Sequence, residues 1–246
     1  MRDLDKPRGE LYCCGDIHGE LETLVWNLTE RYGLENCSVI VLGDFGVGFS
    51  KSPEEGLKVL YNKIEDKLNK KNITLYAIRG NHDDPKFFDG TICFPRLNLL
   101  KDGVLKEIEG FLVYPIGGAT SIDQEERKNQ NKDWEKYGSS RRCWWENERP
   151  DRNIVFPNYA DVIVSHTAPM SFRPVISRSN NMSLDIFNSD REDREFLDEA
   201  LKKIRCSRWY FGHFHKTTMG SFNDLIYRGL DIMELIRVYD IGNYYK

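Results

Sequence analysis

The chain has 246 residues, of which 40% are hydrophobic and 30% are charged, a composition ordinary for a soluble globular protein. Its formal net charge of −4 gives no general attraction to nucleic acid or to an anionic membrane. No apolar run approaches the ~18 residues that a membrane-spanning helix needs, and the polar first residues lack the apolar segment of a signal peptide. The six cysteines show no zinc-type spacing. We therefore expect a cytoplasmic protein with reduced thiols and no membrane association.

The first part of the chain alternates strands and helices. Apolar, β-branched runs predict strands, and apolar residues that recur on one face predict helices. In chain order the expected elements are a strand at 10–14, a helix at 20–32, a strand at 38–42, a helix that begins at 53 and a strand at 73–78. Ser52 is expected to cap the second helix, with Pro53 at its first position and Glu55 completing a capping box. This alternation is typical of a parallel sheet with crossover helices.

The middle of the chain changes character. Residues 104–108 and 111–116 predict a hairpin that joins a second, partly antiparallel sheet. Residues 119–153 are polar and irregular, with little periodicity, yet they contain three of the five tryptophans. We expect this segment to be an insertion that lies on a single domain spanning 1–246.

The strand pattern resumes after the polar segment. Strands are expected at 161–164, 208–211, 217–222, 225–228 and 235–239. Between the first two of these, Ser189 and Glu192 predict a capping box for a helix whose inward face carries Phe196, Leu197 and Ile204. The second half of the chain thus adds further strands and one more helix to the α/β pattern.

Five of the expected strands end in polar side chains that suit a binding site better than a core. These side chains are Asp16 and His18, Asp44, Asn81 and His82, His166, and His213 and His215. All five histidines of the chain belong to this set, whereas unrelated histidines would also fall on helix faces. Because residues that follow parallel strands gather in the crevice at the carboxyl edge of a sheet, we expect them in one place.

The chemistry of this set indicates metal ions. Aspartate and histidine with an asparagine suit metals such as Mn²⁺, Fe²⁺/Fe³⁺, Co²⁺, Ni²⁺ or Zn²⁺, whereas Mg²⁺ or Ca²⁺ sites are richer in oxygen ligands. The set holds too many ligands for one ion, but two ions ~3.5–4 Å apart that share one carboxylate would use them all. Asp44, alone after its strand, is the natural shared ligand.

Five short motifs occur in a fixed order, namely Gly15-Asp16-x-His18, Gly43-Asp44, Gly80-Asn81-His82-Asp83, His166 and Gly212-His213-x-His215. In residue types and order they resemble the calcineurin-like metallophosphoesterase superfamily, over residues 14–215. The resemblance implies an α/β fold, a four-layer α-β-β-α sandwich of two mixed sheets flanked by helices. It also implies the ligands of two metals: Asp16, His18, Asp44 and His215 for one, and Asp44, Asn81, His166 and His213 for the other. His82 would be the catalytic histidine, with Asp83 as its orienting partner.

This assignment predicts a phosphoesterase. Two divalent ions and two aspartates leave a positive charge that suits a phosphate ester, and the ions would lower the pKa of a bridging water to give a hydroxide nucleophile. His82 would protonate the leaving oxygen or stabilise charge that develops there.

The substrate class stays open between two alternatives. We favour a phosphomonoesterase that acts on a small phosphorylated compound or a phosphopeptide. The alternative is a phosphodiesterase or nuclease that acts on a nucleotide or a nucleic-acid end. A non-catalytic interaction module of the same fold is less expected, because no ligand and no catalytic histidine is missing.

One motif departs from a branch of the resembled superfamily. Its protein Ser/Thr phosphatases follow their Gly-Asp with x-Val-Asp-Arg-Gly, whereas here Gly48 stands where the phosphate-binding arginine would be. This departure argues against protein phosphatase specificity. The replacement candidates are Arg79, Arg141, Arg142 and Arg173, although a surface or structural role is the commoner one for arginine.

The 119–153 segment is the expected source of specificity, since loops on a rigid scaffold usually carry it. It combines rings that can stack with guanidinium groups that fit phosphate oxygens, in Trp134, Trp144, Trp145, Arg127, Arg141 and Arg142. The alternative is that the tryptophans only attach a polar loop to the core. We expect the segment to form one wall of the substrate pocket, with Arg141 or Arg142 facing the metals. The oligomeric state is not predicted.

Overall fold

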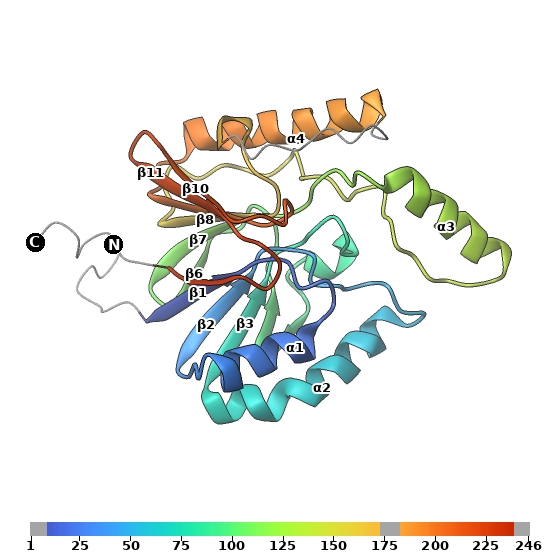
Figure 1. Cartoon of the computed structure of the whole chain (residues 1–246), viewed down its shortest axis with the longest axis horizontal. Coiled ribbons are helices and arrows are strands. Elements are labelled where there is room, and N and C mark those ends of the chain that lie inside the picture. Colours follow the sequence, from blue (N-terminus) through green and yellow to red (C-terminus); the bar gives the residue numbers. More distant parts are fainter. Residues whose placement is uncertain (1–8, 173–182, 239–246) are drawn as a thin grey trace, which may run out of the picture.

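The computed structural model describes residues 9–172 and 183–238. Within them, two six-stranded sheets lie face to face (Figure 1). The first has the order β12 (Leu235–Arg237), β1 (Glu10–Cys14), β2 (Cys37–Val41), β3 (Ile73–Ala77), β5 (Leu97–Leu99), β4 (Cys93–Phe94). The second has the order β10 (Thr218–Phe222), β11 (Leu225–Gly229), β9 (Arg208–Phe211), β8 (Val162–Ser165), β7 (Phe111–Ile116), β6 (Lys106–Ile108). In each sheet the four inner strands are parallel and an antiparallel strand forms each edge.

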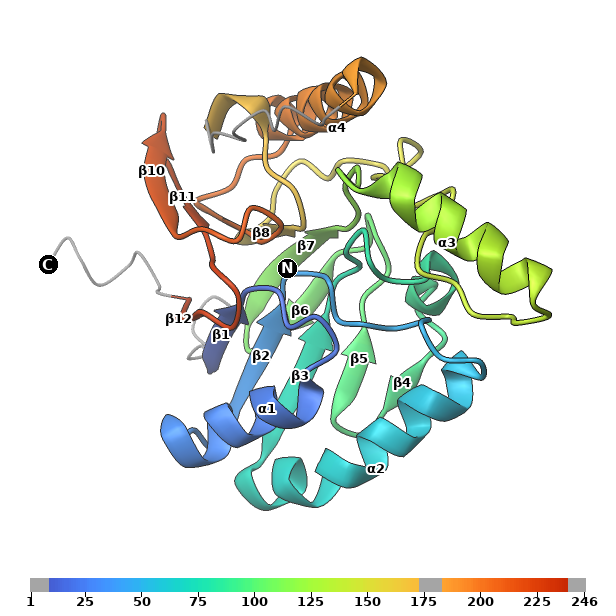
Figure 2. The same ribbon diagram turned by 45° about the vertical axis from the view of Figure 1, so that its right-hand side comes forward.

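Helices cover the outer faces of both sheets. On the first sheet lie α1 (Leu21–Trp26), which continues as a π-helical segment over Asn27–Arg31, and α2 (Pro53–Lys71). On the second lies α4 (Leu184–Lys203), so the predicted four-layer α-β-β-α sandwich is confirmed (Figure 2). Short 3₁₀ helices occupy Pro85–Phe88 and Met170–Phe172. None of the helices in the described ranges is long and apolar enough to cross a membrane.

Three apolar layers hold these four layers together. The alternation of side chains along a strand decides which layer each residue enters. In β1, Leu11 and Cys13 pack between the two sheets, whereas Cys14 packs toward α1 and α2. In β2, Ile40 likewise faces the second sheet and Val39 faces the helices. The layer between the second sheet and α4 is rich in buried aromatic rings, namely Tyr114, Phe172, Trp209 and Phe211.

The start of α2 is close to the prediction, but its cap is not. Ser52 stands at the N-cap position and Pro53 begins the helix, yet the Ser52 side chain makes no capping hydrogen bond. The predicted capping box with Glu55 is therefore wrong. The Ser52 backbone has φ −126° and ψ 80°. The helix is held instead by its buried face, which consists of Leu57, Tyr61, Ile64 and Leu68.

The start of α4 differs from the prediction by more than one turn. Ser183 is the N-cap, and its Oγ accepts a hydrogen bond from the backbone N–H of Ile186. Ser189 therefore lies inside the helix. Glu192 accepts a hydrogen bond from Arg149 and caps nothing. The predicted capping box was wrong because two serines precede the same apolar face, and the earlier start lets Ile186 join the buried residues.

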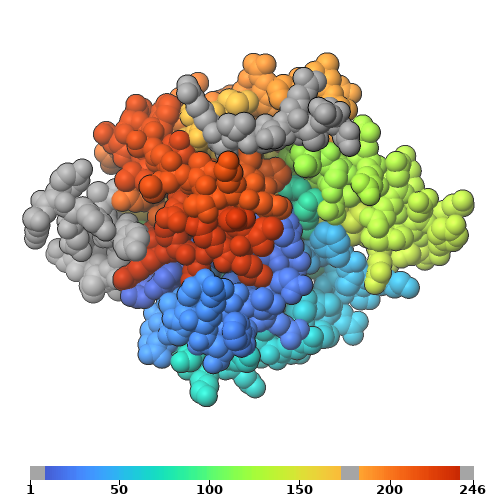
Figure 3. Space-filling model, in the orientation of Figure 1, coloured from blue at the N-terminus to red at the C-terminus, as the bar shows by residue number. Residues whose placement is uncertain are grey.

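The 119–153 segment is less irregular than predicted. It contains α3 (Gln124–Lys136), which projects at one side of the molecule (Figure 3). None of the 13 residues of α3 is buried, so no apolar period announces the helix. The hairpin of β6 and β7 is confirmed, whereas the two-residue β4 and three-residue β5 were not predicted. Of the predicted strand at 235–239, β12 covers the first three residues, and Tyr239 lies outside the described residues.

Candidate metal centre and active site

The predicted ligands lie together at the carboxyl ends of strands from both sheets. Asp16 and His18 follow β1, Asp44 follows β2, Asn81 and His82 follow β3, His166 follows β8, and His213 and His215 follow β9. Carboxyl ends of parallel strands form the usual ligand crevice of α/β proteins. Here the crevices of two facing sheets combine, which brings residues 199 positions apart, such as Asp16 and His215, into direct contact.

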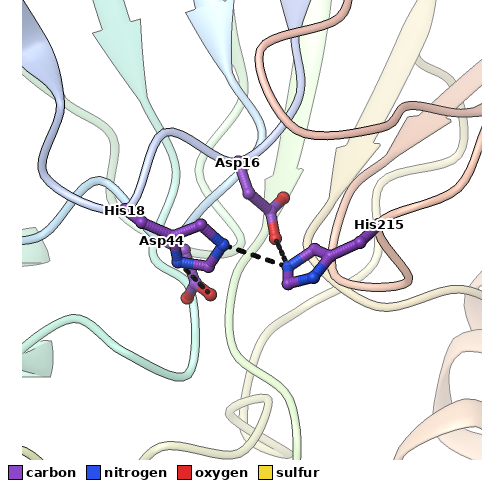
Figure 4. A group of neighbouring side chains, drawn as sticks. All are labelled: Asp16, His18, Asp44 and His215. Carbon is purple, nitrogen blue, oxygen red and sulfur yellow. Dashed lines mark hydrogen bonds and ion pairs between the residues drawn. The ribbon is translucent and has the colours of Figure 1, made fainter.

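The first ligand group contains Asp16, His18, Asp44 and His215 (Figure 4). One ligand atom of each lies within 4.8 Å of the others. Nε2 of His18 and Nε2 of His215 are 3.1 Å apart, and the latter also lies 3.1 Å from Oδ2 of Asp16. Atoms that bind one ion at roughly 2.0–2.2 Å lie about 3 Å from each other. Two carboxylates and two imidazoles at this spacing therefore fit a divalent metal ion.

Glycines let the strand ends approach this closely. A Cβ atom on Gly80 would lie 2.1 Å from the backbone nitrogen of Asp44, and one on Gly212 would lie 2.1 Å from Oδ1 of Asp16. The backbone also turns sharply at the ligands themselves, because His18, Asp44, His213 and His215 have φ values from 46° to 66°. That region is unfavourable for residues other than glycine, and such strain is typical of functional sites.

A second group of donor atoms lies beside the first. Nδ1 of His166 donates to the carbonyl oxygen of Leu42 at 2.7 Å, which leaves Nε2 as the atom that can bind a cation. Nε2 lies 2.8 Å from Oδ1 of Asn81 and 3.3 Å from Oδ1 of Asp44. The ring of His213 packs edge-on against that of His166, with centroids 5.0 Å apart. Nε2 of His166 and the two oxygens beside it thus have the spacing of atoms that bind one ion.

Asp44 belongs to both groups. Its Oδ2 lies 3.6 Å from Nδ1 of His18, and its Oδ1 lies 3.3 Å from Nε2 of His166. Oδ1 also accepts the backbone N–H of His82 at 2.9 Å. Each oxygen thus faces a different ligand group, which is the arrangement that a bridging carboxylate needs.

The buried carboxylates make the site attractive to cations. Burial alone would raise the pKa of Asp44, but the rings of His166 and His82 outweigh burial and hold that pKa below its usual range. Burial alone would lower the pKa of His166, but Asp44 and Asp16 outweigh it and raise the pKa to about 9. The pKa of His213 is lowered by burial and by the neighbouring His166. An environment that holds a proton on a buried imidazole would also favour a metal cation.

A cavity of about 640 Å³ opens onto these ligands. His82 lines it, and burial lowers the pKa of His82, with Asp44 opposing that shift and Arg127 adding to it. The 119–153 segment contributes Ile122, Asp123 and Arg127 to the lining, and the loop after β9 contributes Phe214 and Lys216. A phosphate with an attached organic group would therefore meet metal ligands, cationic side chains and apolar side chains in one cavity.

Asp83 follows His82 in sequence but points elsewhere. Its carboxylate, fully buried, accepts hydrogen bonds from the backbone N–H groups of Phe45, Gly46, Val47 and Gly80 at 2.7–3.0 Å. Burial and the nearby Asp44 raise the pKa of Asp83 to about 6, while these amides oppose the shift. Asp83 thus orders the loop after β2 against the loop after β3, and the predicted orienting contact with the His82 ring is not among its hydrogen bonds.

Three of the four arginines proposed for phosphate binding do not line the cavity. Arg79 is 3% exposed and pairs with Asp102 at 3.0 Å, so it has a structural role. Arg142 lies 3.8 Å from Glu135 of α3, and neither Arg141 nor Arg142 lines the cavity. Arg173 lies outside the described residues.

The arginine that does line the cavity is Arg127 of α3. Its Nε donates to Asp123 at 2.6 Å and its Nη1 to the carbonyl oxygen of Cys143 at 3.4 Å. The sequence places Arg127 among the guanidinium groups of the 119–153 segment but favours Arg141 or Arg142 for the pocket. The local signal for Arg127 is its i, i+4 spacing from Asp123. Gly48, at the position of the missing arginine, has φ 112°, and a Cβ there would lie 2.8 Å from the ring of Trp145. A side chain at that position is therefore excluded by both conformation and space.

Two mixed sheets flanked by helices, with aspartate and histidine ligands at their joined strand ends, define a class of metal-dependent phosphoester hydrolases. The family model for calcineurin-like phosphoesterases matches residues 10–217, and the chain belongs to this family. A search of the curated proteins returned no match. Among solved structures, the chain is similar to the crystal structure of a "Putative 5'-Nucleotidase from Staphylococcus aureus" in complex with alpha-ketoglutarate, with 14% identity and a TM-score of 0.43. That match covers 93% of this chain and 50% of the other, so the chain spans about half the length of that protein.

Proposed function

We propose that the chain is a dinuclear-metal phosphoesterase, with a phosphomonoester as the favoured substrate. The observation that carries the proposal is the position of Asp44, whose two carboxylate oxygens face two different ligand groups at the base of one cavity. The first ion would be held by Asp16, His18, Asp44 and His215, and the second by Asp44, Asn81, His166 and His213. Mn²⁺, Fe²⁺/Fe³⁺, Zn²⁺, Co²⁺ and Ni²⁺ all suit these donors.

The residues around the ions have separate roles in catalysis and in positioning. When bound, two divalent ions supply positive charge for the phosphate and activate water as the nucleophile. His82 lines the cavity without belonging to either ligand group, so it is placed to donate a proton or a hydrogen bond to the leaving oxygen. Asp83 keeps the loops that carry Asp44 and His82 in register through its four backbone hydrogen bonds.

Arg127 is the residue that we propose to bind the phosphate from the substrate side. Within the described part of the chain its Nη2 makes no hydrogen bond, so one end of the guanidinium remains available to an oxygen. Lys216 adds a second cation to the same cavity. Two cations beyond the metals favour the more highly charged monoester over a diester, whereas a nucleotide or nucleic-acid diester remains the alternative substrate. Arg141 and Arg142 stay as candidates for outer contacts to a larger phosphopeptide.

Replacing Arg127 by Ala is expected to lower kcat/KM for a phosphomonoester by about 10–100-fold. A hydrogen bond to a charged group contributes roughly 1.5–3 kcal/mol, and each 1.36 kcal/mol is about tenfold in rate. The measurement is steady-state kinetics of the Arg127→Ala protein, with the Arg141→Ala/Arg142→Ala double variant as comparison. If the double variant loses activity and Arg127→Ala does not, the phosphate is bound by Arg141 or Arg142 and not by Arg127.

Turnover of p-nitrophenyl phosphate against bis-p-nitrophenyl phosphate, with and without added Mn²⁺, tests the proposed function. A monoesterase hydrolyses the first compound faster and requires the metal. Faster hydrolysis of the second compound would establish the diesterase alternative. Hydrolysis of neither, in a protein that binds Mn²⁺, would favour a non-catalytic module of the same fold.

A further inference from the structure

Asn81 is the one amide ligand of the second group, and its ability to bind a metal depends on which way the amide faces. The oxygen of an asparagine amide can bind a metal, whereas the –NH₂ group can only donate hydrogen bonds. The two ends are nearly equal in size, so neighbouring groups must select the orientation. Here Oδ1 lies 2.8 Å from Nε2 of His166, on the side of the second ligand group. Nδ2 donates to Oγ of Ser121 at 2.9 Å.

The hydroxyl of Ser121 can accept from Asn81 because its own proton goes elsewhere. Ser121 Oγ donates to Oε2 of Glu148 at 2.6 Å, and the backbone N–H of Ser121 donates to Oε1 of Glu148 at 2.9 Å. Burial raises the pKa of Glu148 to about 7, while the two hydrogen bonds from Ser121 oppose that shift. The ionised carboxylate only accepts hydrogen bonds, so it fixes the direction of the hydroxyl proton. The hydroxyl then presents a lone pair toward Nδ2 of Asn81, which keeps Oδ1 turned toward His166.

This chain of hydrogen bonds is buried and held firmly. Asn81, Ser121 and Glu148 are each at most 2% exposed. The carbonyl oxygen of Glu148 accepts from Nη1 of Arg79 at 2.8 Å, and Arg79 itself pairs with Asp102. Within the described ranges no cation lies within ion-pair distance of the Glu148 carboxylate, and burying an unpaired carboxylate is costly. The burial of Glu148 is explained if its carboxylate orients Asn81 through Ser121.

We propose that Ser121 and Glu148 are positioning residues that fix the amide of Asn81 for the second metal ion. The inference deepens the proposed function and rests on it. The 119–153 segment would thus support the metal centre itself, in addition to forming a wall of the cavity. Loss of a partner that orients a ligand typically weakens metal binding by roughly 10–100-fold. We expect that loss at the second site alone, because among the described residues the hydrogen bonds of Ser121 reach Asn81 and Glu148 and no ligand of the first site.

The test is Mn²⁺ binding to metal-stripped protein, measured by isothermal titration calorimetry with the bound metal counted by elemental analysis. Ser121→Ala removes the closest acceptor for Nδ2 and leaves it, among the described residues, only the ring of His82, whose Nε2 lies 3.2 Å away. We expect the affinity for the second Mn²⁺ to fall by about 10–100-fold, whereas Ser121→Thr keeps the hydroxyl and restores the affinity. Glu148→Gln preserves size but places an –NH₂ group against Oγ, which turns the hydroxyl proton toward Asn81. We expect this variant to lower the affinity for the second Mn²⁺ as well. If Ser121→Ala does not fold, Glu148→Gln alone tests the positioning role.

Thr120→Ala is the matched control. Thr120 is the neighbour of Ser121, is 1% exposed, and donates its hydroxyl to a buried carboxylate, Oδ2 of Asp193, at 2.7 Å. Its loss should cost similar thermal stability but leave both Mn²⁺ affinities at wild-type values. The inference is overturned if Ser121→Ala and Glu148→Gln bind the second Mn²⁺ with wild-type affinity. It is also overturned if Thr120→Ala lowers that affinity equally, or if the wild-type protein binds a single Mn²⁺. A wild-type protein that binds two ions but hydrolyses no phosphoester would instead overturn the proposed function, while the affinities still test the positioning role.

Discussion

The Asp44→Asn protein is expected to lose tight binding of both metal ions and, with them, phosphoesterase activity. Asp44 is the only residue whose two carboxylate oxygens face both ligand groups among the described residues. Replacing one oxygen by –NH₂ removes a ligand from one ion and a negative charge from both. The loss of affinity should exceed the roughly 10–100-fold typical of a lost outer partner, and elemental analysis after dialysis would measure it.

His18→Ala is the natural comparison for Asp44→Asn. His18 lies in the first ligand group, with its Nε2 3.1 Å from that of His215. Its loss should weaken mainly one ion and leave about half of the bound metal. If Asp44→Asn still binds two ions tightly and turns over normally, the carboxylate does not bridge them.

His82→Ala is expected to lower kcat by about 10²–10⁴-fold, the usual contribution of a positioned general acid. Metal content should stay near that of the wild-type protein, because His82 belongs to neither ligand group. The contrast is with His166→Ala, which removes an Nε2 only 2.8 Å from Oδ1 of Asn81 and should release metal. Kinetics and metal analysis on both variants separate the two roles. A His82→Ala protein that has lost one or both ions would show that His82 is a ligand.

Much of the fold could be predicted because the buried strands carry it. β1, β2 and β3 are short apolar runs followed closely by Gly-Asp or Gly-Asn, and a run of this length between polar turns predicts a buried strand. α3 could not be predicted, since a helix without a buried face has no apolar period to detect. β4 and β5, with two and three residues, are too short for any alternation to emerge.

The candidate ligands could be predicted for a different reason. Each follows a strand, and the topology of a parallel sheet brings strand ends together whatever the intervening sequence is. No such rule predicts the residues that support the ligands. Whether Asp83 turns toward His82 or toward the amides of the loop after β2 depends on the local backbone. Ser121 meets Asn81 across 40 residues of chain, and Glu148 meets Ser121 across 27, so only the tertiary fold brings them together.

Removal and return of the metal test the central claim most directly. Protein stripped of metal by a chelator would be titrated with Mn²⁺ while bound ions and turnover of p-nitrophenyl phosphate are followed together. We expect no turnover in the stripped protein, and a rise in activity that is complete when two ions are bound per chain. Full activity in the stripped protein, or activity that saturates with one bound ion, would contradict a dinuclear-metal phosphoesterase.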